Sequence, residues 1–466
     1  MPAAYHHGSE TIRVNGGSVP VSQVDGAIIG IVGTAPIGEV NVLKRCVTKK
    51  DFAQFGNILD RGYSLCDALD ILSRYAAGQV YVVNVLDPSK HRTTVSEEAL
   101  ELDAMTLIAQ TANVGLIELS LKDNEDVLVE GTDYRVDLLT GEITLLKALN
   151  APQLKATYSY ADPSKVTEAE IKGGVDSRTE ARSGFELLTA SFNLFGADAK
   201  VLICPQYDAT ATMAAALETY ASRLNAVAYV AAPPNTTLSQ AIAGRGPEGS
   251  INFKTSSDRT QLFFPYLLGE RNTLESLATH AAGLRMLTDV EQGYWYSISN
   301  RQLKGVVGVE VALTARIDDQ QSETNRLNAV GITTVFNSFG TGFRMWGNRL
   351  ACYPTVTHIS NFETVQRTAD LIDESIRRAE LQYMDLPIDE ALLDSLLSTV
   401  ETYMGTLKSI VGFSVQLDPD ADLVDAFSRG QVPIQYDFTP KIPAERITNT
   451  SVVTRKYLVN LVSGGQ

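Results

Sequence analysis

The sequence predicts a mixed α/β fold, in which a core of alternating strands and helices is interrupted by an antiparallel β unit. Three observations support this prediction. Apolar, β-branched runs alternate with amphipathic segments of helical length before residue 93 and after residue 185. Between these positions, closely spaced turn signals separate short alternating strands. A helical region and an extended segment follow toward the C-terminus.

The bulk composition is that of a multidomain globular protein. A chain of 466 residues exceeds one ordinary domain, so we expect two to four. The charge balance is 39 Lys and Arg against 55 Asp and Glu, a net charge of −16. Such an acidic surface repels phosphate backbones and anionic lipids. We therefore expect no direct contact with nucleic acid and no direct membrane insertion.

The cysteines and the N-terminus indicate a cytoplasmic folding environment. Four cysteines lie far apart, without CxxC pairing or a nearby histidine, which favours buried thiols over disulfides or zinc ligands. The N-terminus has neither a basic nor an apolar segment, so we expect no signal peptide. No apolar run approaches the ~18 residues that span a bilayer. The cysteines are Cys46, Cys66, Cys204 and Cys352.

An extended arm is predicted ahead of the first domain. Residues 9–24 alternate loosely between apolar and polar side chains, and Gly16, Gly17 and Pro20 interrupt them. A segment of this kind has unpaired backbone groups and little core of its own. It therefore needs a sheet elsewhere.

Strand, helix and strand follow this arm. The unbroken apolar run of residues 27–33 predicts a buried strand, and residues 80–85 predict a β-branched one. Between them, residues 63–77 place apolar side chains close to helical spacing, and Gly78 ends the helix.

The character of the sequence changes from about residue 93. Short alternating pieces at residues 134–136, 143–145 and 156–160 lie between turn signals and predict a small antiparallel β unit. The polar stretch 163–182 that follows predicts a connector.

The α/β pattern then resumes. Residues 199–205 predict a strand, residues 210–224 an Ala-rich helix, and residues 226–231 the next strand. A βαβ unit of this kind favours a parallel sheet with a right-handed crossover. The simplest interpretation is one α/β domain with a β domain inserted into it.

The C-terminal part predicts two helices and a final strand. Residues 365–384 form a long amphipathic helix with a charged opposite face. Pro387 breaks this helix, and Asp389 can cap a second helix with a leucine-rich stripe. Residues 447–461 alternate in part and predict a terminal strand after an extended lead.

These patterns divide the chain into five parts. The predicted parts are an N-terminal arm, 1–25; an α/β core domain, 26–92 and 186–358; an inserted β domain, 93–185; a C-terminal α+β domain, 359–446; and a C-terminal arm, 447–466.

A phosphate-binding loop and a histidine metal site are two candidate sites, and each lacks residues that such a site needs. The Gly-rich residues 30–38 follow a strand, as phosphate loops do, but they lack the GK[ST] ending, and Pro36 removes an amide. The adjacent His6 and His7 point to opposite faces of an extended arm, and the other histidines are isolated. We expect a simple turn and polar contacts respectively.

A third candidate is the charge cluster around Asp318, Asp319 and Glu323, beside Arg316 and Arg326. Such residues can form an acid/base site, but a solvated or interface charge network explains them with fewer assumptions. No nucleophile elbow or Cys/His pairing accompanies them. We therefore predict no catalytic residue, no cofactor and no metal ligand.

Four stretches stand out as a set along the chain. They are residues 5–8 with 27–35, residues 202–205, residues 342–349, and the long helix after 359–362. The most specific is Trp346-Gly347-x-Arg349 in the third stretch. In this order they resemble the tail sheath proteins of contractile-tailed bacteriophages of the myovirus type, which are related to the sheaths of phage-tail-like bacteriocins.

The resemblance implies a structural protein, not an enzyme. Its copies would form stacked six-fold rings around a tail tube, and would slide and rotate as the sheath shortens to drive the tube through the host envelope for genome delivery. The implied partners are other copies of the chain, the tail tube protein, and the baseplate and tail terminator proteins. The implied location is the virion tail sheath, assembled in the host bacterial cytoplasm.

The resemblance also assigns roles to the ends and to the insertion. In this family, terminal arms add strands to a small sheet in neighbouring subunits, and β regions like 93–185 are variable, outward-facing insertions. The subunit-interface residues expected on the arms are Thr11, Ile12, Val14, Val453, Arg455, Tyr457 and Val459.

Two alternatives stay open at this point. An α/β enzyme would have needed a clustered His, Asp or Cys site, which the sequence does not supply. The sheath of a phage-tail-like bacteriocin or of another contractile injection machine is the second. Secretion-system sheaths are normally split over two chains, which weighs against that member of the class.

Overall fold

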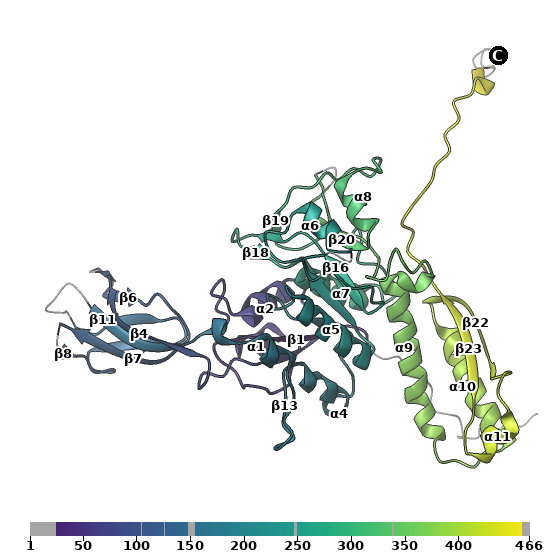
Figure 1. The fold of residues 1–466 in the computed structure, drawn as a ribbon, viewed down its shortest axis with the longest axis horizontal. Coiled ribbons are helices and arrows are strands. Elements are labelled where there is room, and N and C mark those ends of the chain that lie inside the picture. Colours follow the sequence, from purple (N-terminus) through teal and green to yellow (C-terminus); the bar gives the residue numbers. More distant parts are fainter. Residues whose placement is uncertain are drawn as a thin grey trace, which may run out of the picture.

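The fold is elongated and consists of three packed units in a row, with a C-terminal segment that projects sideways from near the top of α9 (Glu363–Glu380) (Figure 1). The computed structural model describes residues 25–103, 105–124, 126–147, 154–246, 249–337 and 340–458. Each unit has its own cluster of buried apolar side chains. The predicted fold class, α/β with an antiparallel β insertion and a helical α+β C-terminal part, is confirmed.

An eight-stranded sheet forms the central unit. Its strands are β1 (Ile28–Gly33), β2 (Lys44–Cys46), β3 (Gln79–Asn84), β14 (Val201–Ile203), β15 (Val227–Ala231), β16 (Thr260–Phe263), β20 (Ile332–Phe336) and β21 (Arg344–Trp346). They lie in the order β2-β3-β1-β14-β15-β16-β20-β21. The six inner strands run parallel, and the two edge strands run antiparallel to their neighbours.

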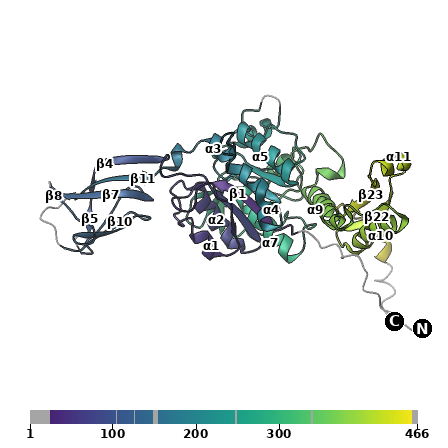
Figure 2. The ribbon, with the colours of Figure 1, turned by 90° about the horizontal axis from the view of Figure 1, so that it is seen from below.

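Helices cover both faces of this sheet. The helices α2 (Ser64–Tyr75) and α7 (Leu277–Glu291) pack together on one face, and α5 (Ala211–Leu224) lies on the other (Figure 2). Burial on both faces explains why the inner strands read as continuous apolar runs. The shorter helices are α1 (Lys49–Ala53), α3 (Glu168–Lys172), α4 (Ser191–Phe195), α6 (Leu238–Ala243) and α8 (Glu323–Asn328).

Two small sheets accompany the core. One contains β17 (Leu267–Gly269), β18 (Leu274–Glu275) and β19 (Val306–Val309); the other contains β12 (Gly174–Val175) and β13 (Arg182–Ser183). The short 3-10 helices are η1 (Pro163–Lys165), η2 (Gly184–Ala190), η3 (Ile359–Asn361), η4 (Leu381–Tyr383) and η5 (Lys456–Leu458).

The polar stretch 163–182 is not a plain connector, which corrects the sequence-based prediction. It forms η1, α3 and β12, and it buries Val166 and Ile171 in the apolar cluster of the central unit. Ile171 is fully buried because α3 packs against η2 and α5. A predominantly polar segment can therefore contribute to a core through two side chains.

The insertion forms the second unit and consists of two four-stranded sheets. One sheet has the order β4-β11-β7-β8 and the other β5-β6-β10-β9, and the pairs within each are antiparallel. The strands are β4 (Arg92–Leu100), β5 (Leu102–Asp103), β6 (Ile108–Gln110), β7 (Leu116–Asp123), β8 (Asp126–Val127), β9 (Tyr134–Asp137), β10 (Glu142–Leu145) and β11 (Leu154–Ala161).

The third unit combines three helices with a β-hairpin. Its elements are α9 (Glu363–Glu380), α10 (Glu390–Thr406), β22 (Ile410–Leu417), α11 (Leu423–Ser428) and β23 (Ile434–Pro440). Asp389 caps α10 as expected, because its carboxylate accepts a hydrogen bond from the Leu392 amide. The apolar cluster lies between the two long helices and one face of the hairpin.

The third unit joins the core at the amino ends of the parallel strands. Lys200, just before β14, pairs with Glu374 of α9, and Arg259, just before β16, pairs with Asp370. The insertion leaves from the opposite side, after the carboxyl end of β3. The two outer units are therefore attached at opposite ends of the parallel strands and lie on opposite sides of the central unit (Figure 1).

No helix in the described part of the chain is long and apolar enough to cross a bilayer. All four cysteines are buried free thiols, as predicted. Burial raises the pKa of the Cys46 and Cys66 thiols to about 12, so both stay protonated at neutral pH.

Candidate functional site

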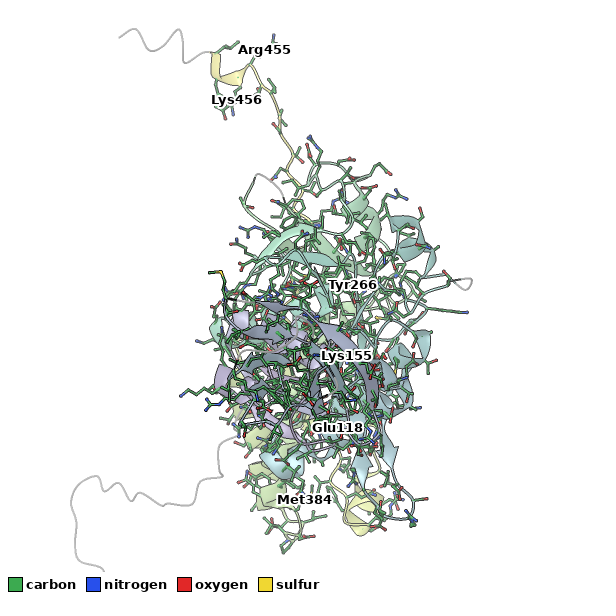
Figure 3. The ribbon with its side chains drawn as sticks, turned by 90° about the vertical axis from the view of Figure 1, so that its left-hand side faces the viewer. Glu118, Lys155, Tyr266, Met384, Arg455 and Lys456 are labelled. Carbon is green, nitrogen blue, oxygen red and sulfur yellow. The ribbon has the colours of Figure 1, made fainter. Side chains whose placement is uncertain are left out.

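The C-terminal arm extends away from the body of the subunit. From Ile442 to Leu458 it has no strand, and Val453 is fully exposed while Tyr457 is 65% exposed. Figure 3 shows Arg455 and Lys456 well clear of the packed units. The predicted strand over 447–461 is therefore absent from residues 447–458, which end in η5; Val459 lies outside the described residues.

The hairpin β22–β23 offers an incomplete sheet. It has two strands, and within the described residues neither outer edge is paired. Its inner row, Phe413, Val415, Tyr436 and Phe438, packs on the helices of the third unit but is only partly buried. An edge with free N–H and C=O groups can accept a further strand.

The motif residues Trp346 and Gly347 shape the edge of the central sheet. Trp346 stacks on Phe336 across the β20–β21 pair, with ring centroids 4.5 Å apart. Gly347 has φ of 140°, and a Cβ there would lie 2.9 Å from the Cα of Thr333. Only glycine allows the chain to turn this close to the neighbouring strand.

The third motif residue, Arg349, lies at the base of the C-terminal arm. Its guanidinium donates to both carboxylate oxygens of Glu445, at 3.1 and 3.0 Å. It also lies over the rings of Phe362 and Tyr353, at 3.6 and 4.7 Å from their centroids. The motif thus connects the sheet edge to the arm.

The N-terminal arm is seen only at its base. Thr11, Ile12 and Val14, predicted as interface residues, lie outside the described residues. At Gly26, the carbonyl oxygen accepts a hydrogen bond of 3.0 Å from Arg367 of α9. The base of the N-terminal arm is therefore bound to α9, the helix that begins directly after Phe362.

Four buried charged side chains join α7 to α9. Arg367 donates to both oxygens of Asp289, at 3.1 and 2.5 Å, and Arg285 pairs with Asp289 at 2.6 Å. Glu363 accepts from Tyr229 at 2.9 Å and lies 3.4 Å from Arg285. Each of the four charged side chains is 3% exposed or less.

The two carboxylates favour the charged form of Arg367. Burial on its own would lower the pKa of Arg367, but Asp289 and Glu363 outweigh burial and raise it. Burial and the Glu363 carboxylate raise the pKa of Tyr229, so its hydroxyl stays a donor. The sequence predicts a charged face on this helix but not the burial of Glu363 and Arg367 against α7.

The Gly-rich loop after β1 is a closed turn. The Thr34 amide donates to Ser64 Oγ at 3.0 Å, and the Ala35 amide donates to Asn84 Oδ1 at 3.0 Å. A Cβ on Gly33 would lie 2.4 Å from Ser64 Oγ. The two amides that would face a phosphate are already engaged, in agreement with the predicted simple turn.

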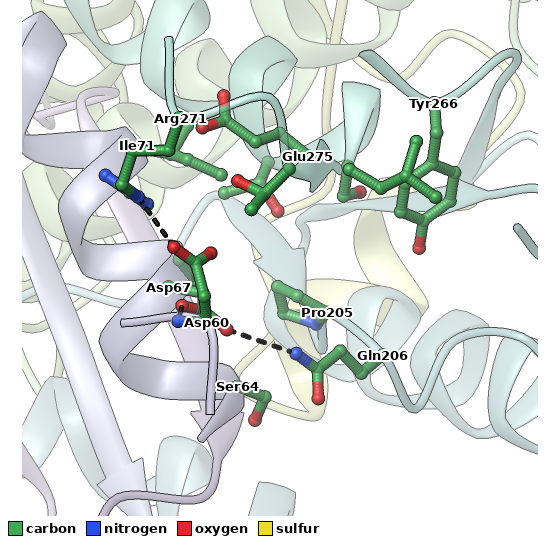
Figure 4. Close-up of a pocket in the computed structure, with 14 residues that line it drawn as sticks. Asp60, Ser64, Asp67, Ile71, Pro205, Gln206, Tyr266, Arg271 and Glu275 are labelled. Atoms are coloured by element: carbon green, nitrogen blue, oxygen red, sulfur yellow. Dashed lines mark hydrogen bonds and ion pairs between the residues drawn. The ribbon is translucent and has the colours of Figure 1, made fainter. Parts of the chain in front are cut away.

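A small polar cavity lies at the carboxyl ends of β14 and β16 (Figure 4). Its volume of about 60 Å³ is far below the several hundred Å³ that are usual for a small-molecule site. Asp67 accepts from the Asp60 amide at 2.8 Å, and Arg271 donates to the Asp60 carboxylate at 2.8 Å. Burial raises the pKa of Asp67 to about 6.

Glu275 borders this cavity and belongs to a structural charge chain. Burial alone would raise its pKa, but hydrogen bonds from His280 and Arg74 and their charges lower it to about 2. The carboxylate is thus ionised and bonded to both partners. This chain ties α2 to α7 and β18.

The remaining candidates are surface features. Arg316 and Asp318 form an exposed pair at 2.6 Å, and Glu323 accepts from the Thr314 amide at 2.8 Å. His6 and His7 lie outside the described residues, and among those described no three His, Cys, Asp or Glu side chains could hold a metal ion.

Comparison with protein families places residues 180–349 in the phage tail sheath protein central domain. The chain is 45% identical over 478 aligned residues to the tail sheath protein of Burkholderia phage BcepMu, and the match covers 100% of both proteins. It is 28% identical over 305 residues to the tail sheath protein of Escherichia phage P2, which covers 64% of this chain and 74% of that protein.

Solved structures give the same picture at the level of the fold. The helical sheath of the anti-feeding prophage in its contracted state has a TM-score of 0.59 and 14% identity, covering 97% of this chain and 98% of that one. The contracted sheath of the extracellular contractile injection system PVC has a TM-score of 0.58 and 13% identity, covering 98% and 99%.

Proposed function

Because this chain belongs to the phage tail sheath family, we propose that its copies stack as six-fold rings around a tail tube. It is a structural subunit of a contractile tail sheath, and a tail sheath is a component of the virion. In our proposal the sheath assembles in the host bacterial cytoplasm, with tail tube, baseplate and tail terminator proteins as partners. Its shortening drives the tube through the host envelope and delivers the genome.

Neighbouring copies are joined, in this proposal, by strand addition. The observation that carries it is that the same chain contains both an exposed arm and an incomplete, two-stranded sheet. The arm of one copy would add a strand to the β22–β23 hairpin of another, and main-chain hydrogen bonds would hold it. Residues Val453, Arg455, Tyr457 and Val459 of the C-terminal arm, and Thr11, Ile12 and Val14 of the N-terminal arm, are the proposed contacts.

Burial and charge both support this pairing. The apolar row of the hairpin is only partly buried by its own helices, so added strands can complete its burial. Residues 441–458 carry four basic side chains and one acidic, whereas residues 410–440 carry five acidic and one basic. Opposite charges steer an arm toward a hairpin and away from another arm.

The predicted division into domains fits the same proposal. The core and the C-terminal part, 26–92, 186–358 and 359–446, would form the polymer, and the insertion, predicted at 93–185, would face outward. The packing of Val166 and Ile171 on the core supports a narrower insertion, close to residues 92–162.

Deletion of residues 447–466 tests strand addition. We expect a folded subunit with a nearly unchanged melting temperature that forms no tubes by sedimentation or negative-stain microscopy. Mixed with the intact chain, the truncated subunit should act as a terminator, because it can receive an arm but not donate one. Normal tubes from the truncated chain would refute strand addition by this arm, and an unfolded product would assign the segment to its own subunit.

A second candidate is the sheath of a phage-tail-like bacteriocin or contractile injection machine. The similarity in fold to the anti-feeding prophage and PVC sheaths favours it. The genomic neighbourhood distinguishes the two. Capsid and terminase genes nearby would identify a phage, and their absence a bacteriocin or injection machine.

A further inference from the structure

Arg349 is held in place before it meets the arm. Its guanidinium lies over the rings of both Phe362 and Tyr353, and its Nη1 donates to Asn361 Oδ1. The backbone around it is fixed too, because the Leu350 amide donates to the Asn361 carbonyl at 2.8 Å. These contacts leave the Nε side of the planar guanidinium facing the arm.

Glu445 is the carboxylate that this face receives. It lies five residues after the end of β23, and both its oxygens are within 3.1 Å of Arg349 Nε. Beyond it, residues 446–458 are exposed and hydrogen-bond only among themselves within the described part of the arm. Glu445 is therefore the point at which the arm leaves its own subunit.

A surface ion pair is ordinarily a weak interaction, because water competes for both partners and two long side chains lose freedom. The Arg349 pair differs in both respects. Stacking on two rings shields and orders the guanidinium, and the fork geometry accepts one carboxylate direction. The conformational entropy of the Arg349 side chain is therefore already lost through these contacts, whether or not Glu445 is bound.

We propose that Arg349 is the positioning residue of the C-terminal arm: it clamps Glu445 and so fixes the point and direction in which the arm leaves toward a neighbouring copy. This inference rests on the proposed strand addition between copies. The part of the chain beyond Glu445, residues 446–466, spans at most about 70–75 Å when extended. A clamped origin confines its tip to fewer positions and raises its effective concentration at one receiving hairpin.

The test uses the full-length chain and two variants, Arg349→Lys and Glu445→Gln, separately and together. Lysine keeps the charge but loses the fork and most of the stacking; glutamine removes the charge and leaves Arg349 and its rings intact. We expect each variant to raise the critical concentration for tube formation about tenfold, with an unchanged melting temperature. Because the two act through one pair, the double variant should be no worse than either single variant.

Arg446→Lys is the matched control, since it makes the same substitution at the adjacent, unclamped position, and it should assemble as the wild type does. Wild-type critical concentrations for Glu445→Gln, or additive effects in the double variant, would overturn the clamp. If Arg349→Lys fails to fold, Glu445→Gln alone decides. Normal assembly after deletion of 447–466 would instead refute the proposed strand addition, so the two failures are distinguishable.

Discussion

The two outer units are attached to the central sheet by different chemistry. The third unit joins the core through buried ion pairs, in which Arg367, Asp289 and Glu363 are almost fully enclosed. The insertion joins it through a narrow neck, where the Tyr63 hydroxyl donates to the Ala161 carbonyl at 2.7 Å and lies 3.0 Å from that of Val114. Charged side chains also reach the neck, but they are less enclosed: the Arg61 guanidinium donates to the Ala112 carbonyl at 3.4 Å, and the Glu170 carboxylate that pairs with His91 is 38% exposed.

This difference predicts how separable each unit is. A buried charge without its partner is severely destabilising, so the third unit and the core depend on each other. A neutral hydrogen bond contributes about 1 kcal/mol, so the insertion can be altered with little effect on the core. The polymer-forming parts are thus one mechanical body, and the insertion is an appendage.

Asp289→Ala should produce the largest effect. It leaves Arg285 and Arg367 buried with only Glu363 near them, and we expect a loss of about 3–5 kcal/mol in the free energy of unfolding. Urea unfolding followed by tryptophan fluorescence measures it. Glu291→Ala, on the same helix but 51% exposed in its side chain, is the control and should cost less than about 1 kcal/mol. Equal losses in the two variants would contradict the contrast between the attachments.

Tyr63→Phe should produce an intermediate effect at the neck. The substitution leaves two buried carbonyl oxygens without their donor, and we expect a loss of about 1–2 kcal/mol in the free energy of unfolding. Faster proteolytic cleavage between the insertion and the core should accompany it. Tyr296→Phe, at a half-exposed tyrosine, should change neither measurement. A loss as large as that of Asp289→Ala would place the neck in the same class as the buried ion pairs.

Removal of the insertion should change the core still less. Arg92 and Ala161 are directly paired in the β4–β11 ladder, so a short Gly-Ser linker can replace residues 93–160. We expect a soluble chain whose melting temperature shifts by only a few degrees. Deletion of 95–183 should be more damaging, because it also removes Val166 and Ile171. An insoluble product from the shorter deletion would contradict the appendage interpretation.

The smallest effect concerns the Glu170–His91 pair at the neck, whose nitrogen and oxygen are 2.7 Å apart. Burial alone would raise the pKa of Glu170, but hydrogen bonds from Thr167 and His91 outweigh it and lower the pKa. A lowered folded pKa stabilises the protein above the unfolded value of about 4.3, and this contribution is lost as pH falls through the folded value.

The wild type should therefore exceed Glu170→Gln by less than about 1 kcal/mol at pH 7, because the carboxylate is 38% exposed. The difference in unfolding free energy should shrink as the pH falls below about 5, through the unfolded pKa of about 4.3 and then through the lower folded pKa. Glu101→Gln, at an exposed site in the insertion, is the control. A difference that grows on acidification would show that the pKa is shifted in the opposite direction.

The core could be predicted from sequence because its rules are local. Strands buried on both faces read as apolar runs, so residues 226–231 predict β15 directly. The helix caps are equally local, as Asp389 and Thr210 show. Elements whose sequence and environment agree are the ones that pattern reasoning finds.

The buried charges could not be found in this way, because a helical pattern assigns Arg and Glu to solvent. Arg367 is a charged residue, which favours an exposed position, but its side chain is only 3% exposed in the structure. The one local signal is the i, i+4 spacing of Glu363 with Arg367 and of Arg285 with Asp289. That spacing occurs on exposed helices too, so it does not specify burial.

For residues 447–461 the sequence could predict only a preference for extended backbone, not a paired strand. Alternation in residues 447–461 favours a strand, but a strand also needs a partner edge. Within one subunit, residues 447–458 have none and stay unpaired. Its pairing therefore remains a prediction about the assembly.

The attachment of both arms to α9 has a consequence for how a pull is transmitted. Gly26 is bound by Arg367, and Glu445 by Arg349 against Phe362, one residue before the helix begins. These anchor points are separated by about five residues, or roughly 8 Å of helical rise. If the arms link neighbouring copies, a force applied to one arm is transmitted to the other through the first two turns of α9. Because Arg349 lies three residues after β21, this path touches the edge of the central sheet, whereas the insertion lies away from it.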